Sequence, residues 1–193
     1  LEGRGESVTV SAQTVINLYY IAELVLKYEN NKSLSQFYIN EAEKLKKNLK
    51  KHAYNEGGFF NSVFNDNGKW IFSDKDPDGQ RRVYGPSNYY ALICGAADKE
   101  MEQSIWDNIE TLKCESGYKL FSPALGHEYI DKVGRIASGD IPDGQWENAS
   151  AYNHGSRGFM IRALAHSNKG DLLETVMQYL LPYNQSVHPV EKT

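Results

Sequence analysis

The feature that most constrains the fold of this chain is a pair of long amphipathic segments joined by a short polar stretch. Apolar side chains recur at helical spacing from about Val8 to Tyr28 and again from about Leu34 to His52. Ser7 is a suitable N-cap for the first segment, and the polar residues 30–33 end it. Because the connection is so short, we predict two helices that pack antiparallel as a hairpin.

A β-hairpin is predicted next. Two apolar stretches, residues 59–64 and 69–72, flank Asn65–Gly68, and the Asn-Gly pair suits a turn with positive φ. The polar residues 73–85 then predict a loop. Pro86 stands at the position where proline is favoured in a helix, so a third helix is predicted to begin there.

The remaining chain is predicted to continue as helix pairs around one long loop. Residues 115–144 lack a sustained period, which predicts a long loop with short strands, and such loops are often functional. Alternating βαβ units and a glycine-rich phosphate loop do not occur in the sequence. We therefore predict a mainly α fold, a segment of an α/α barrel made of paired antiparallel helices. The further helices are expected at about residues 86–97, 99–113, 146–164 and 171–181.

Composition and charge exclude several classes of function. The chain has 193 residues, 40% hydrophobic and 24% charged, which suits one globular domain with a buried core. The net charge of −4 comes without a basic patch, so no nucleic-acid partner is expected. The basic run Lys44–Lys51 contains leucines at helical spacing and predicts a solvated helix face. Neither a signal peptide nor an apolar run of membrane length is recognised, so no membrane association is expected.

A metal site is not expected either. Cys94 and Cys114 have no metal-ligand spacing. With only two cysteines a reduced, cytoplasmic protein is the default expectation, and a disulfide stays open as the alternative. His127, Glu128 and Asp131 are spaced like metal ligands but lack a second ligand set.

The segment Trp146–His154 groups residue types that could bind a sugar and an anion. Glu147 and His154 are seven residues apart, so on one helix they would share a face that binds a polyol and an anion. Trp146 beside Glu147 could stack on the sugar. The alternative is structural: Glu147 favours the positive end of the helix, and His154 is a hydrogen-bonded core residue.

Two further groups of polar residues each allow two interpretations. Glu6, just before the first helix, is a candidate sugar ligand or only a helix-start residue. The loop residues Asp76, Asp78, Arg81 and Arg82 either form ion pairs or line the mouth of a substrate site. A Ser-His-Asp arrangement cannot be recognised.

Three stretches resemble glycoside hydrolase family 94, the inverting β-glycoside phosphorylases that include cellobiose, chitobiose and cellodextrin phosphorylases. They are Gly3–Val8, Gly134–Ile136 and, most specifically, Pro142–His154. The resemblance covers most of the chain. It implies that residues 1–193 are a fragment of a single catalytic domain, its central to C-terminal part, and that this domain is an (α/α)6 barrel.

The resemblance also implies a reaction and site residues. Family members cleave a β-linked disaccharide or oligosaccharide with inorganic phosphate, giving an α-sugar 1-phosphate with inversion and needing no cofactor beyond this co-substrate. By position Glu147 would bind sugar and His154 phosphate, with Trp146 and Glu6 as further candidates for substrate binding. The general acid, an Asp, is expected upstream of Leu1, so no catalytic residue is assigned within the chain and the fragment alone is expected to be inactive. The parent protein is expected to be a homodimer.

Two other functions stay open at this point. In an inverting glycoside hydrolase with a related barrel, Glu147 would be the general base that activates water. A non-catalytic carbohydrate-binding helical domain would use the same residues without turnover.

Overall fold

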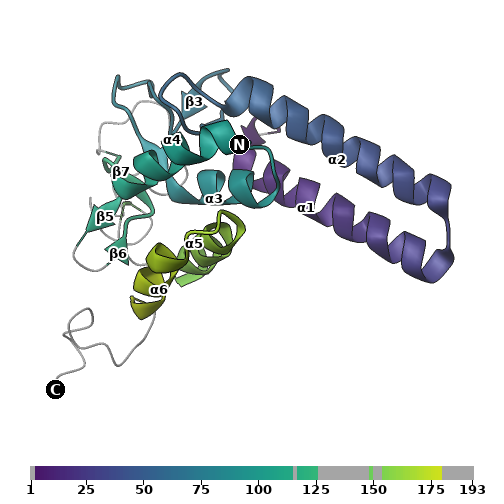
Figure 1. The fold of residues 1–193 in the computed structure, drawn as a ribbon. Coiled ribbons are helices and arrows are strands. Elements are labelled where there is room, and N and C mark those ends of the chain that lie inside the picture. The colour runs from purple at the N-terminus through teal and green to yellow at the C-terminus, as the bar shows by residue number, and fades with distance from the viewer. Residues whose placement is uncertain (1–2, 115–116, 126–147, 150–153, 180–193) are drawn as a thin grey trace.

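The computed structural model describes residues 3–114, 117–125, 148–149 and 154–179, and over these residues the fold is mainly α, as predicted (Figure 1). The 5-residue η1 is a π-helical extension of α1. Closure into an (α/α)6 barrel stays a prediction. The helices are α1 Val8–Leu24, η1 Val25–Glu29, α2 Lys32–Ala53, α3 Gly85–Ile93, α4 Lys99–Glu110, α5 His154–His166 and α6 Gly170–Gln178.

The predicted helical hairpin is confirmed. α1 and α2 pack along each other and extend well beyond the rest of the molecule (Figure 1). The Ser7 hydroxyl caps α1 by accepting a hydrogen bond from the Val10 N–H, and the Asn31 side chain caps α2 in the same way. Asn30, with a φ of 49°, takes the left-handed conformation that ends η1. The chain therefore reverses here through local residues alone.

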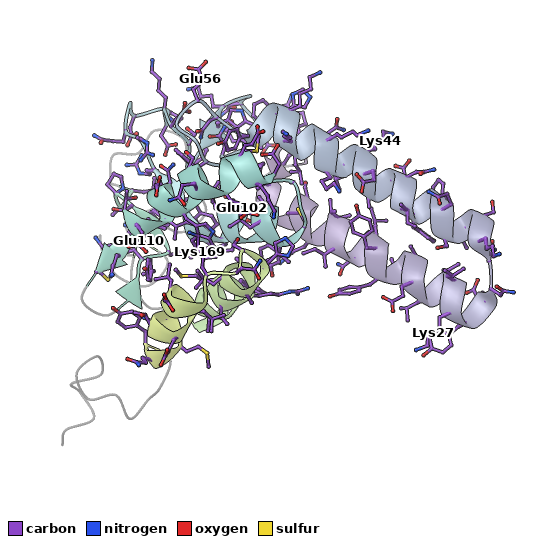
Figure 2. All side chains as sticks on the ribbon, viewed as in Figure 1. Lys27, Lys44, Glu56, Glu102, Glu110 and Lys169 are labelled. Atoms are coloured by element: carbon purple, nitrogen blue, oxygen red, sulfur yellow. The ribbon has the colours of Figure 1, made fainter. Side chains whose placement is uncertain are left out.

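The basic run on α2 lies on a solvated face, as predicted. The side chain of Lys44 is 70% exposed. Figure 2 shows Lys44 on α2 and Lys27 near the far end of the hairpin, both projecting away from the ribbon. Lys50 bonds to Asp98, the N-cap residue of α4, and so connects α2 to the body of the fold.

The core is centred on α3. This helix is buried from Gly85 to Leu92 and packs against α1, α4 and α5. Tyr90 of α3 and Phe159 of α5 place their ring centroids 4.5 Å apart. Burial extends to the polar residues of α3 as well, and the side chain of Asn88 is satisfied there by hydrogen bonds with the backbone of Phe60 and Tyr84.

The predicted β-hairpin is present and belongs to a larger sheet. Strands β2 (Val63–Phe64) and β3 (Trp70–Ile71) form it, and β1 (Glu6–Ser7) adds a third antiparallel strand. Gly68 has a φ of 73°, which the turn requires. Two smaller antiparallel pairs join β4 (Val83–Tyr84) with β7 (Phe121–Ser122), and β5 (Lys113–Cys114) with β6 (Gly117–Tyr118).

The prediction of one helix from residue 146 to residue 164 is wrong. α5 begins only at His154, and Asn148 and Ala149 form a turn. Ala149 has a φ of 66°, outside the right-handed helical region, so a helix cannot run through it. The argument that one helix face carries both Glu147 and His154 therefore fails.

We expected no apolar run of membrane length, but one helix meets that criterion. By length and composition alone, the continuous helix Val8–Glu29 could cross a bilayer. Helices that pack into the core of a globular protein meet the same criteria, and α1 packs against α2 and α3. On its own this helix does not indicate a membrane protein.

Candidate functional site

The structure describes only some of the predicted site residues. Trp146 and Glu147 lie outside the described residues, as do His127, Glu128 and Asp131 of the rejected metal cluster. Among the described residues, no group of three His, Cys, Asp or Glu side chains could hold a metal ion.

His154 is the first residue of α5, a helix of 13 residues. Its backbone therefore lies where the unpaired N–H groups of a helix and the positive end of its dipole favour an anion. The side chain of His154 is outside what the structure describes.

The residue that follows Glu147 has a structural role. Asn148 is 1% exposed, and its side chain forms two hydrogen bonds with the backbone of Leu125. Its Oδ1 accepts from the Leu125 N–H at 2.9 Å, and its Nδ2 donates to the Leu125 carbonyl at 3.0 Å. A buried amide satisfied in this way holds the chain beside Glu147 against a segment far away in sequence.

Arg82 anchors the residues directly before Leu125. It is 2% exposed, and its Nε and Nη2 donate to the carbonyls of Pro123 and Ala124, each at 3.0 Å. It also pairs with Asp78 through two nitrogens, at 2.7 and 2.8 Å, and with Asp76 at 3.0 Å. A buried guanidinium saturated by carboxylates and carbonyls is a structural centre rather than a substrate ligand.

The pKa values of the two aspartates that bond to Arg82 are shifted in opposite directions. Burial raises the pKa of Asp76 although Arg82 and Ser73 donate hydrogen bonds to it. The hydrogen bond from Arg82 lowers the pKa of Asp78, which is less buried. The remaining loop residue, Arg81, bonds to Asn108 and lies over the Phe59 ring, 4.8 Å from its centroid. For Asp76, Asp78 and both arginines, the ion-pair and packing interpretation is therefore the one that the contacts support.

Glu6 is one of the residues that line a cavity of about 400 Å³. The strand register places Glu6 opposite Phe64 and Phe64 opposite Trp70, so the three residues form one row across β1, β2 and β3. Residues directly opposite each other in an antiparallel sheet point to the same face, and all three line the cavity. Asn48 and His52 of α2 line it as well.

Sequence reasoning named Glu6 but missed its neighbours. Asn48 and His52 are four residues apart and therefore share one face of α2. That spacing is visible in the sequence, and so are the aromatic residues on both arms of the predicted hairpin. The contact between α2 and the hairpin is not visible, because it depends on how the elements pack.

Comparison with known families gives one match. The model of the glycosyl hydrolase 94 superfamily, catalytic domain, matches residues 1–192, and a comparison with curated proteins finds no match. The match includes the segment around Asn148 and both sides of the cavity beside Glu6. The chain therefore belongs to the catalytic domain of the glycosyl hydrolase 94 superfamily, whose members act on glycosides.

Proposed function

We propose that the protein containing this chain is a glycoside phosphorylase. It cleaves a β-linked disaccharide or oligosaccharide with inorganic phosphate and releases an α-sugar 1-phosphate with inversion. Membership of the family supports glycoside chemistry. The resemblance of Pro142–His154 to the phosphorylases supports the choice of phosphate as the nucleophile.

The observation that carries the choice of phosphate is the start of α5 at His154. An anion at this position would lie at the positive end of the helix dipole and near the backbone N–H groups of the first turn, and we propose that the imidazole of His154 adds a hydrogen bond. Phosphate needs such a site. A hydrolase that activates water through a carboxylate does not, so this geometry favours phosphorolysis over hydrolysis.

The proposed step is a single displacement at the anomeric carbon. A phosphate oxygen forms the new bond to this carbon while the bond to the leaving sugar oxygen breaks on the opposite face, which inverts the configuration. The general acid, the Asp expected upstream of Leu1, gives its proton to the leaving oxygen. His154 donates a hydrogen bond to phosphate, Glu147 accepts hydrogen bonds from sugar hydroxyls, and Trp146 stacks on the sugar.

The test uses the natural protein that carries this chain. It is incubated with β-linked disaccharides with and without phosphate, and products are followed by ³¹P NMR and by an assay for reducing sugar. The proposal expects an α-sugar 1-phosphate that forms only when phosphate is present. Hydrolysis without phosphate would instead favour the inverting hydrolase, in which Glu147 would be the general base. Sugar binding without any turnover would favour the non-catalytic domain.

A further inference from the structure

We propose that the cavity beside Glu6 binds a sugar ring, with Trp70 as the stacking surface. Glu6, Phe64 and Trp70 form one row on one face of the three-stranded sheet, and this face borders the cavity. The row places a carboxylate and two aromatic side chains next to one another on three adjacent antiparallel strands. None of these three side chains is fully buried, so each can contact a ligand.

The aromatic pair is arranged so that it can act as a platform. The ring centroids of Phe64 and Trp70 are 5.1 Å apart, and their planes are inclined by 60°. Packing against Phe64 restrains the indole of Trp70, so little conformational entropy is lost when a ligand stacks on it. The C–H face of a pyranose is the apolar, flat surface that suits such a ring.

The polar groups around the cavity match a neutral polyol. Glu6 supplies acceptors only, whereas Asn48, His52 and Ser11 can each donate as well as accept. A sugar hydroxyl is itself both donor and acceptor, so this mixture can satisfy several hydroxyls at once. A phosphate would be repelled by the Glu6 carboxylate, and a metal ion would find only one carboxylate among the lining residues.

Part of the cavity lining is apolar. Val8, Leu49 and Ala53 belong to it and are 3%, 6% and 2% exposed. A lining that combines apolar and polar groups suits a sugar, which offers both apolar C–H faces and hydroxyls. A volume of about 400 Å³ lies in the range of ligand pockets, roughly 300 to 1,000 Å³.

This inference rests on the proposed function only for the choice of probe, a β-linked disaccharide. Binding can therefore be measured without phosphate and without turnover.

The test is calorimetric titration of the 193-residue chain with three β-linked glucose disaccharides: cellobiose, laminaribiose and sophorose. Saturable binding of at least one is expected. Glu6→Gln should weaken it about tenfold, because a charge-assisted hydrogen bond is lost. Trp70→Ala should weaken it roughly tenfold or more. If Trp70→Ala alters thermal unfolding, Trp70→Phe is used instead, because it keeps an aromatic ring. Its affinity for the disaccharide should lie between that of the unaltered chain and that expected for Trp70→Ala.

Matched controls come from α2 outside the cavity. Glu41→Gln removes an exposed carboxylate, and Phe37→Ala removes an aromatic ring that is 55% exposed. Both should bind like the unaltered chain. The inference is overturned if none of the three disaccharides binds, or if Glu6→Gln and the Trp70 variants bind as well as the controls. Phosphate-dependent cleavage is assayed separately. If no sugar binds at this cavity, the proposed phosphorylase function is therefore unaffected, and if no phosphorolysis is found, the sugar site can still be tested by binding.

Discussion

The side chain of Asn148 pairs with both backbone groups of Leu125, accepting from its N–H at 2.9 Å and donating to its carbonyl at 3.0 Å. The amide of one side chain thus makes the pair of hydrogen bonds that the backbone of a neighbouring β-strand would make. Ala149, the next residue, then takes a left-handed φ of 66°. Asn148 therefore holds its own part of the chain against Leu125, and its amide is buried in this contact.

Replacing Asn148 with Ala is expected to lower the free energy of unfolding by about 2 to 4 kcal/mol. Both hydrogen bonds are lost, and the buried N–H and C=O of Leu125 lose these partners. Urea unfolding measures the change. Asn40→Ala is the control, since Asn40 is exposed on α2 and should change stability by about 0.5 kcal/mol or less. An equally small effect at Asn148 would contradict the anchoring role.

The break at Ala149 shows why this part of the site could not be predicted. Sequence alone favours a helix through an alanine, and the left-handed turn is held by Asn148 and Leu125, which are 23 residues apart. The contacts of Arg82 with Pro123 and Ala124 cross about 40 residues in the same way. Local signals predicted the α1–α2 hairpin, because its caps and its turn are all encoded within a few residues.

The sugar cavity was predictable only in part. Glu6 could be named from its place before α1, and a hairpin could be named from Asn65–Gly68. The pairing of Phe64 with Trp70 could not, because a shift of one residue would turn one ring to the other face of the sheet. Asn48 and His52 of α2 line the same cavity, and this depends on tertiary packing that the sequence pattern does not show.

Acid sensitivity should depend on Asp78. Its pKa is lowered by the hydrogen bond from Arg82, so the pair stabilises the fold above the ordinary pKa of 3.8, and this contribution is lost as the pH falls below it. We expect Asp78→Asn to lower the Tm at pH 7 and to show a smaller further decrease between about pH 5 and pH 2 than the unaltered chain. Thermal unfolding across this range checks it. If the Tm of both proteins falls by the same amount over this pH range, the Asp78–Arg82 pair is not the cause. The control is Asp107→Asn, which removes an exposed carboxylate on α4.

Gly58 is expected to tolerate alanine poorly. Its φ is 81°, and an added Cβ would overlap the Ser104 hydroxyl. Gly79 has a φ of 79° but open space around it, so Gly79→Ala measures the backbone cost alone, about 1 kcal/mol. Gly58→Ala should lose more stability than Gly79→Ala in chemical unfolding. Equal losses would mean that Ser104 moves aside without cost.

Cys94 should resist alkylation in the folded chain. Burial raises the pKa of its thiol from 9.0 to about 11, so at pH 8 almost none is thiolate. Iodoacetamide followed by mass spectrometry should modify the half-buried Cys114 first, and Cys94 only after unfolding. The Cys114→Ser variant leaves Cys94 as the only thiol, so its alkylation can be followed alone. Rapid labelling of Cys94 in the folded Cys114→Ser protein at pH 8 would contradict the expected protection.

The raised pKa of Cys94 also predicts that the free energy of unfolding declines as the pH rises from about 9 to 11, because the thiol ionises at a lower pH in the unfolded chain than in the folded one.

His154→Ala in the natural protein separates a phosphate ligand from a core histidine. If the imidazole donates a hydrogen bond to phosphate at the start of α5, its removal should raise the phosphate KM about tenfold or more, because hydrogen bonds to charged groups contribute about 1.5 to 3 kcal/mol. The KM for the disaccharide and the Tm should change little. His166→Ala is the matched control, since His166 is exposed at the other end of the same helix. A large fall in Tm with an unchanged phosphate KM would instead show that His154 stabilises the core, and the anion site would have to be sought elsewhere.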